Sequence, residues 1–90
     1  MLKQIQRKIA EGKFQATSHI LYKSLPDDSC SLADVFNAIL EGELTDILDH
    51  DEGGQRYEIT GPTLEGYAMG IVCRFSRDGQ LIVLITSYVI

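Results

Sequence analysis

The chain has 90 residues, of which 44% are hydrophobic and 23% are charged. This is the composition of an ordinary globular protein, and it excludes a disordered or fibrous chain. A chain of this length gathers its apolar side chains into one core, so we expect a single α+β domain covering residues 1–90. The longest apolar run, Leu81 to Ile85, is much shorter than the roughly 20 residues that span a bilayer. Polar and charged residues interrupt residues 1–12, so we predict no secretory signal, no membrane association and a cytoplasmic location.

The charge of the chain is unevenly distributed. The net charge is −5, but residues 27–58 contain ten acidic residues against one base, Arg56. Residues 1–26 contain five bases and one acid, which predicts a local basic face. The acidic total argues against binding to duplex DNA, which depends on neutralising many phosphates. Two cysteines, Cys30 and Cys73, are too few for a disulfide framework, so we expect reduced thiols, with Cys73 in the core.

The first 26 residues predict two helices around a short strand. Apolar residues recur every three or four positions at the start, which indicates an amphipathic helix: Leu2, Ile5 and Ile9. Gly12 is expected to end that helix. Weak alternation over residues 13–17 predicts a short strand. Ser18 then resembles the N-cap of a short helix that runs to Leu25 and is broken by Pro26.

A third helix is predicted over residues 32–41. Ser31 and Asp34 have the spacing of a capping box, with Asp in the usual position of Glu. Gly42 is expected to end this helix. One apolar stripe runs along it: Leu32, Val35, Phe36, Ile39 and Leu40.

From Leu44 onward the apolar residues alternate, which is the period of a strand. Residues 44–48 predict one strand and residues 50–54 a polar turn. Tyr57 and Ile59 are expected to point to one face of the next strand, which ends at a turn framed by three residues: Gly61, Pro62 and Gly66. A long strand then alternates through five residues: Tyr67, Met69, Ile71, Cys73 and Phe75.

The last strand, residues 81–89, is apolar on both faces and is therefore expected to lie inside the sheet. Asp78-Gly79 predicts the hairpin turn before it. The four strands after Leu44 form a meander. The sequence thus predicts an α+β fold in which helices from the first half pack on one face of an antiparallel sheet from the second half.

The sequence contains no motif that identifies a catalytic or cofactor site by itself. It has no phosphate-binding glycine loop, no C-x-x-C pair, no H-E-x-x-H and no nucleophile elbow. The potential metal ligands are scattered, without the short spacings that place two of them on one turn: His19, Cys30, His50 and Cys73. We therefore predict neither a metal nor a cofactor, and we interpret the acidic run around His50 as a polar turn.

Four residues are candidates for a functional site. His19 and Lys23 lie one helical turn apart on the same face, where an imidazole transfers protons and an ammonium binds phosphate. Alternatively, His19 caps its helix or packs against the sheet. Arg56 is either a phosphate ligand or one half of a cross-strand ion pair with a glutamate. Tyr88 either presents its hydroxyl at the edge of the sheet or is an ordinary strand residue.

Five segments, in this order, resemble the bacterial domain-of-unknown-function 4258 family over nearly the whole chain: IQRKIAEGKFQATSH, SLADVFNAILEGEL, RYEITGPTLEG, YAMGIVCRF and LIVLITSYV. That family is similar to ribonuclease toxins of the RelE and MqsR type. The resemblance implies a compact α+β fold in which helices pack on an antiparallel sheet.

The resemblance also carries over individual residues. His19 matches the early histidine of the family, Arg56 matches the arginine before an aromatic strand residue, and Tyr88 matches the terminal tyrosine. Lys23 stands where arginine is usual, so the planar bidentate contact to phosphate is lost. Gly70 stands where some members place a second histidine, which weakens the catalytic interpretation.

Two functions are therefore expected, from different classes. The first is a metal-independent endoribonuclease of a toxin–antitoxin system, with RNA as its substrate and an antitoxin protein as its partner. In it, His19 transfers protons, Lys23 and Arg56 hold the phosphate, and Tyr88 positions the substrate or donates a proton. The alternative is a noncatalytic protein-interaction module that uses a sheet edge or the acidic surface.

Overall fold

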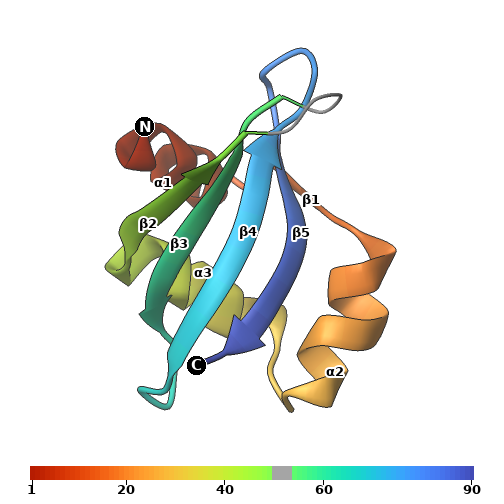
Figure 1. Ribbon diagram of the computed structural model, residues 1–90, viewed down its shortest axis with the longest axis vertical. Helices are drawn as coiled ribbons and strands as arrows, with labels where there is room; N and C mark the ends of the chain where they lie inside the picture. Colours follow the sequence, from red (N-terminus) through yellow and green to blue (C-terminus); the bar gives the residue numbers. More distant parts are fainter. Residues whose placement is uncertain (50–53) are drawn as a thin grey trace.

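The computed structural model of the protein describes residues 1–49 and 54–90 (Figure 1). The described residues form an α+β fold with one five-stranded sheet, and the helices lie in the first half of the chain. In chain order the elements are α1 (Leu2–Ala10), β1 (Phe14–Ala16), the π-helical turn η1 (Ile20–Ser24), α2 (Leu25–Asp27), α3 (Leu32–Glu41), β2 (Glu43–Leu48), β3 (Arg56–Pro62), β4 (Ala68–Phe75) and β5 (Ile82–Val89). No described helix is long and apolar enough to cross a membrane.

The sheet has the strand order β1-β5-β4-β3-β2 (Figure 1). The predicted meander from β2 to β5 is confirmed, and β5 is an interior strand between β4 and β1. The prediction of a purely antiparallel sheet is wrong, because β1 pairs in parallel with β5, with Phe14 opposite Ile82 and Ala16 opposite Leu84. Parallel neighbours require a long crossover connection, and here all the elements from η1 to β4 supply it. Alternation within residues 13–17 indicates a strand but carries no information about its direction.

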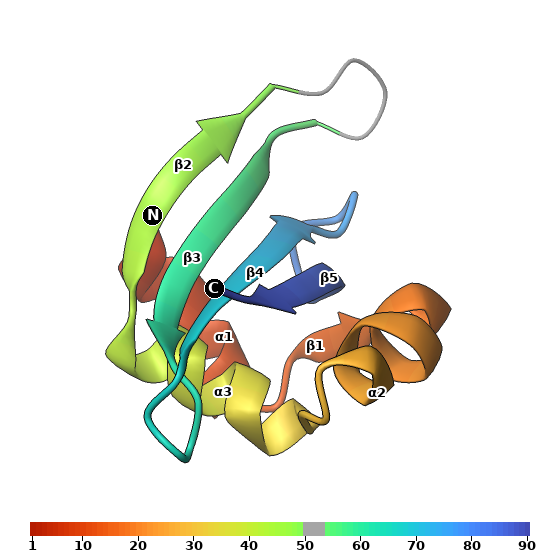
Figure 2. The ribbon, with the colours of Figure 1, turned by 60° about the horizontal axis from the view of Figure 1, so that its bottom comes forward.

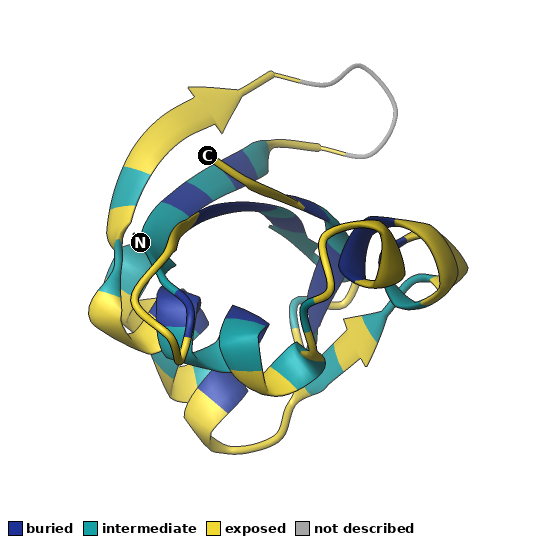
Figure 3. Cartoon of the chain, turned by 90° about the horizontal axis from the view of Figure 1, so that it is seen from below, coloured by how far each residue is buried: buried dark blue, intermediate teal, exposed yellow. Residues whose placement is uncertain are grey.

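The core lies between one face of the sheet and the helices α1 and α3. Figure 2 shows these two helices on the same side of the sheet, and Figure 3 shows buried segments along the strands that arch over α3. The fully buried side chains include Ile5, Ile20, Val35, Ile39, Ile59, Met69, Ile71, Cys73, Ile82 and Leu84. On β3 burial falls on Tyr57 and Ile59, as predicted. On β4 Met69, Ile71 and Cys73 are buried as predicted, but Gly70 is buried as well, and Tyr67, predicted to belong to this strand, precedes it and is 62% exposed.

The helix α3 begins with the predicted capping box. The Ser31 hydroxyl accepts a hydrogen bond from the Asp34 amide at 3.4 Å, and the Asp34 carboxylate accepts one from the Ser31 amide at 2.9 Å. The predicted apolar stripe is only partly correct. Val35 and Ile39 are fully buried, whereas Phe36 is half-buried and Leu40 is 44% exposed. The third fully buried position of the helix is Ala38, a small residue that lets the helix lie close to the sheet.

The second helical segment differs from the prediction at both ends. Its cap is Thr17, whose hydroxyl accepts a hydrogen bond from the Ile20 amide at 3.2 Å, so the prediction of Ser18 as the N-cap is wrong. The segment also continues past Pro26 to Asp27. Proline in a regular helix clashes with the carbonyl one turn earlier. The turn before Pro26 is π-helical, with the Leu25 amide bonded to the Ile20 carbonyl, and this wider turn accommodates the ring.

The connections follow the glycines of the sequence. Gly12 ends the turn after α1 and Gly79 forms the β4–β5 hairpin turn, both with positive φ (74° and 73°), which glycine adopts without strain. Both turns were predicted. The polar turn predicted at residues 50–54 lies outside the described residues, except for Gly54.

Candidate functional site

Every second residue of the central strands points away from the core and forms a second face of the sheet, here called the outer face. It consists of Arg56, Glu58, Thr60, Gly70, Val72, Arg74, Val83, Thr86 and Tyr88. The pairing places Thr60, Gly70 and Tyr88 in one row across β3, β4 and β5. Tyr57 pairs with Cys73 on the core side, so the adjacent residues Arg56 and Arg74 are neighbours on the outer face.

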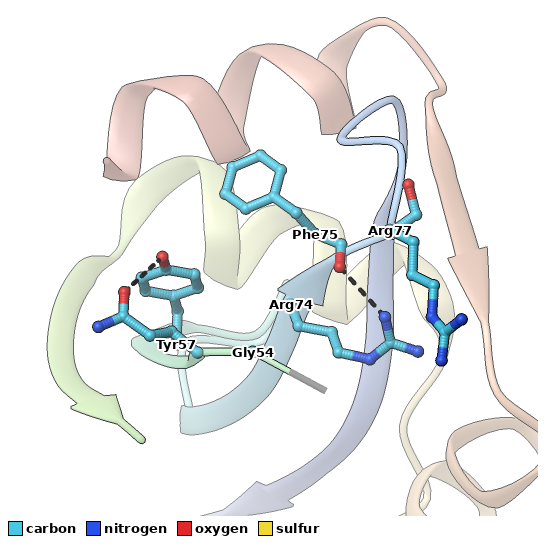
Figure 4. A pocket seen from close by; sticks show the side chains of 7 residues that line it. Gly54, Tyr57, Arg74, Phe75 and Arg77 are labelled. Carbon is cyan, nitrogen blue, oxygen red and sulfur yellow. Dashed lines mark hydrogen bonds between the residues drawn. The ribbon is translucent and has the colours of Figure 1, made fainter. Parts of the chain in front are cut away.

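A cavity of about 460 Å³ lies at the end of the sheet where β3 begins and β4 ends, within the size range of small-molecule sites. We call it the arginine cavity; it is lined by Gly54, Gln55, Tyr57, Arg74, Phe75, Ser76 and Arg77. In Figure 4, Arg74 near the end of β4 runs across the view and Arg77 in the turn after β4 runs down it, and both guanidinium groups end on the same side of the picture. Arg56 lies beside Arg74 on the outer face but does not line the cavity.

Hydrogen bonds and ring packing fix the wall of the arginine cavity. The Tyr57 hydroxyl donates to Gln55 Oε1 at 3.1 Å, and the Tyr57 ring meets the Phe75 ring edge-on with centroids 6.0 Å apart. One Arg74 nitrogen donates to the Phe75 carbonyl at 3.1 Å (Figure 4). Since a guanidinium has five N–H donors, this single bond orients Arg74 and leaves the other donors for a ligand.

The electrostatics of the arginine cavity favour an anion. Among residues 1–49 and 54–90, neither Arg74 nor Arg77 lies within ion-pair distance of a carboxylate. The nearby Asp78 is already held by the Ser76 hydroxyl at 2.7 Å and the Gln80 amide at 3.0 Å. The Ser76 hydroxyl, the backbone amides and Lys8 lower the pKa of Asp78. Two guanidinium groups on one cavity are suited to an anion such as a phosphate or a carboxylate. Each guanidinium group can form two parallel hydrogen bonds to such an anion.

The predicted residues His19 and Lys23 lie on the helical segment beside β5 and not on the sheet. His19 is exposed, and its side chain does not cap the helix. Lys23 forms an exposed ion pair with Asp27 at 3.1 Å. The segment contacts the outer face through Ser24, whose hydroxyl is 2.9 Å from that of Thr86. The two residues therefore flank β5 and line no part of the arginine cavity.

Arg56 and Tyr88 share the outer face but lie at opposite ends of it. Arg56 belongs to the row of Arg74, and Tyr88 to the row of Thr60. Four strand residues separate the two rows, or about 13 Å along the strand. The Arg56 Nε is buried without a hydrogen-bond partner among the described residues, and the expected ion pair with a glutamate does not form there.

The space above Gly70 is filled by Tyr88. A Cβ atom on Gly70 would overlap with the Tyr88 ring, so the tyrosine covers the position at which the resemblance places a second histidine in some relatives. Tyr88 remains 41% exposed.

Sequence reasoning missed Arg74 and Arg77 as site residues. In the sequence both are simply basic residues in the C-terminal part of the chain, and nothing in their spacing indicates a shared cavity. The available signal was positional: Arg74 lies near the end of a predicted strand and Arg77 in the turn that follows, and strand ends often carry binding residues.

Neither cysteine has the environment of an activated thiol. Burial raises the pKa of Cys73 to about 12. Burial, and then the carboxylates of Asp34, Asp28 and Glu65, raise the pKa of Cys30. Among the described residues, no group of three or more His, Cys, Asp or Glu side chains is arranged to hold a metal ion.

Comparison of the chain with protein-family models, with curated proteins and with solved structures finds no match.

Proposed function

We propose that this protein binds single-stranded RNA and cleaves it as a metal-independent endoribonuclease. The observation that carries the proposal is the arginine cavity, in which Arg74 and Arg77 present guanidinium groups that no described carboxylate neutralises. Arginine forks bind phosphate oxygens with defined geometry. The resemblance of the sequence to RelE- and MqsR-like toxins supports RNA as the source of those phosphates.

In this proposal the RNA strand follows the outer face from the arginine cavity toward Tyr88, beside the helical segment that contacts this face through Ser24. Arg56 and Arg74 are neighbours at one end, and Tyr88 is exposed at the other. His19 and Lys23 stand beside the face, on the segment that Ser24 joins to Thr86. A strand crossing the face would extend over about 13 Å, which two to three nucleotides cover when each spans about 6 Å.

The proposed reaction uses the ribose 2′-hydroxyl of the RNA as the nucleophile. Its oxygen attacks the adjacent phosphorus, the bond from phosphorus to the 5′-oxygen breaks, and the products end in a 2′,3′-cyclic phosphate and a 5′-hydroxyl. His19 takes part in proton transfer, the cations hold the charge that develops on the phosphate oxygens, and Tyr88 positions or protonates the leaving oxygen. No protein–phosphorus bond forms in this scheme.

The test uses a labelled 20-nucleotide RNA and its 2′-O-methyl counterpart, each in buffer with excess EDTA. We expect the protein to bind both strands and to cut only the RNA, leaving cyclic phosphate ends visible by mass spectrometry. Arg74→Gln with Arg77→Gln should weaken binding about tenfold or more, because charge-assisted hydrogen bonds are lost. Lys3→Gln with Arg7→Gln is the matched control, since it removes the same charge from exposed positions on α1.

The catalytic assignment has its own variant. His19→Ala should slow cleavage about 10²- to 10⁴-fold without changing RNA binding, as expected for the loss of a general acid or base. Unchanged cleavage by His19→Ala would remove the assigned role. Equal loss of binding in the cavity variant and in the α1 control would mean that RNA responds only to total charge.

One observation favours the alternative of a noncatalytic module. Tyr88 covers Gly70, and Lys23 is paired with Asp27, so two of the positions with expected chemical roles are occupied by contacts within the protein. If the wild type binds RNA but leaves it intact on several substrates, the binding role stands and the ribonuclease proposal does not. If it neither binds nor cuts RNA, a protein-interaction role replaces both.

A further inference from the structure

The two edges of the sheet differ in how far other parts of the chain cover them. At one edge, β1 pairs with only the first half of β5, and the segment after β1 covers the second half. Thr17 donates to the Ile85 carbonyl at 2.9 Å, and the Asp28 carboxylate accepts the Val89 amide at 3.1 Å. At the other edge, β2 pairs with β3 alone among the described strands. Its free side is a row of backbone groups able to pair with another strand.

The Asp46 carboxylate accepts a hydrogen bond from the neighbouring Ile47 amide at 2.8 Å, and apolar side chains of β2 are exposed. Ile47 is 49% exposed and Leu48 is 37% exposed. Asp46 lies directly opposite Glu58, and like charges in that arrangement repel each other. Neither carboxylate has a cation within ion-pair distance among the described residues. The edge therefore combines an apolar contact surface with an uncompensated pair of negative charges.

We propose that β2 binds a partner protein by strand addition, and that the added strand alternates basic and apolar residues. An added strand continues the alternation of the sheet. Its basic residues meet Asp46 and Glu58 on the outer face, and its apolar residues cover Ile47, which points to the core side opposite Tyr57. A second copy of this chain is a poor occupant, because two β2 strands would bring Glu43 and Asp46 of each close to those of the other.

The register irregularity at Thr45 limits where the partner strand pairs. The pairing of β2 with β3 shifts between Leu44 and Asp46, and the Thr45 hydroxyl lies 3.1 Å from that of Thr60 and donates to the Glu58 carbonyl at 3.2 Å. A bulge bends the strand and interrupts its edge. The stretch from Asp46 to Leu48 is thus the part of β2 that accepts the new strand, and a basic residue of that strand draws the Asp46 carboxylate away from the Ile47 amide. Arg56 and Glu58, which lie opposite this stretch, belong to the outer face proposed for RNA, but neither lines the arginine cavity, and the peptide test uses no RNA, so its outcome does not depend on RNA cleavage.

The experiment uses the full chain and an eight-residue peptide in which valine and lysine alternate. Amide NMR shifts and slowed hydrogen exchange should concentrate on residues 43–48 when the peptide is added. Three matched peptides serve as controls: one with the same residues in two blocks, one with glutamate in place of lysine, and one with N-methyl groups on alternate amides. The N-methyl peptide keeps the charge and removes the ability to extend the sheet.

A charge-reversal variant tests the acidic half of the surface. Asp46→Lys should weaken the binding of the alternating peptide about tenfold or more, because a favourable charge contact becomes a repulsive one. Asp27→Lys, with the same change in net charge at the other edge of the sheet, should leave peptide binding unchanged. Asp46→Lys removes both the repulsion toward Glu58 and the hydrogen bond from the Ile47 amide, so thermal unfolding of the free variant is measured to verify that it is folded under the binding conditions.

Three outcomes would overturn the inference. Equal binding of the N-methyl and unmodified peptides would indicate charge attraction without strand addition. Shifts spread over all acidic residues, or no binding at all, would likewise exclude β2 as the site. Sedimentation showing a dimer that Asp46→Lys dissociates would mean that β2 pairs with a second copy of the chain.

Discussion

Gly42 and Gly61 allow the backbone at the end of α3 to contact the backbone of β3, because neither glycine has a side chain. A Cβ on Gly61 would overlap with the carbonyl oxygen of Ala38, and a Cβ on Gly42 would overlap with that oxygen and with the Thr60 carbonyl. These neighbours are backbone atoms and cannot move without shifting the helix. Gly61 therefore fixes how closely α3 lies against the sheet.

We expect Gly61→Ala to lower the free energy of unfolding by about 1 to 3 kcal/mol or more, the cost typical of overpacking. Gly70→Ala is the matched control on the next strand. Its Cβ would meet only the outer part of the Tyr88 ring, which is partly exposed and can turn away, so its cost should stay below about 1 kcal/mol. Urea denaturation of the two variants compares them directly. Equal losses would contradict the close approach of α3 at Gly61.

Asp34 joins the start of α3 to the β3–β4 turn. Its carboxylate accepts hydrogen bonds from the Ser31 amide at 2.9 Å and the Leu64 amide at 3.0 Å. The Ser31 amide and then the Leu64 amide lower the pKa of Asp34 from its ordinary value of 3.8. A group with a lowered pKa in the folded state contributes stability above its unfolded pKa and loses that contribution as the pH falls through its folded pKa.

Asp34→Asn should therefore destabilise the protein near neutral pH by about 1 kcal/mol, the size of a typical capping contact. The difference between wild type and variant should shrink as the pH falls below 3.8 and through the lowered pKa of the native carboxylate, which is then itself protonated. Denaturation midpoints measured across this pH range test the prediction. A difference that is constant with pH would show that the ionised form of Asp34 makes no contribution.

At the scale of elements, α3 shows how burial depends on position around a helix. Ile39 is fully buried and Leu40, the next residue, is 44% exposed, although both belong to the predicted apolar stripe. Phe36 is half-buried and meets Phe14 edge-on, with ring centroids 4.8 Å apart. Its truncation should consequently cost less than that of a fully buried phenylalanine, for which about 3 to 5 kcal/mol is typical.

Ile39→Ala should lower the free energy of unfolding by about 2 to 5 kcal/mol, because a fully buried aliphatic side chain leaves a cavity. Leu40→Ala, at the neighbouring position, should cost less than about 1 kcal/mol. Thermal or urea unfolding distinguishes the two. A larger loss for Leu40→Ala than for Ile39→Ala would mean that α3 is rotated relative to the sheet.

At the scale of the whole molecule, local patterns account for most of the fold and little of the candidate site. The capping box at Ser31 and the alternation along β3 and β4 predict those elements because each depends on neighbouring residues alone. The parallel pairing of β1 with β5 depends on the path of the entire chain. The position of the helix cap, at Thr17 and not at the predicted Ser18, depends on where the chain turns after β1.

The candidate site is harder to predict for the same reason. Arg56 and Arg74 become neighbours through the register of β3 with β4, and Arg77 reaches the same cavity as Arg74 through the turn after β4. No short spacing in the sequence encodes this arrangement. His19 and Tyr88 lie on different elements: His19 is on the helical segment beside β5, and Tyr88 is near the end of β5 itself.

The pairing of β1 with β5 also bears on how the protein folds during synthesis. Residues 14–16 are translated early, but their sheet partners are residues 82–84. β1 therefore cannot pair until nearly the whole domain has been translated. Contacts of such large sequence separation slow folding, because a long loop must close before they form. The α3–β2–β3–β4 region has only short-range pairings and can assemble first, leaving one face and one strand edge exposed in the nascent chain. When β5 emerges from the ribosome, it pairs with β4 and β1 and completes the sheet. The emergence of this strand is therefore the step after which the native topology can form.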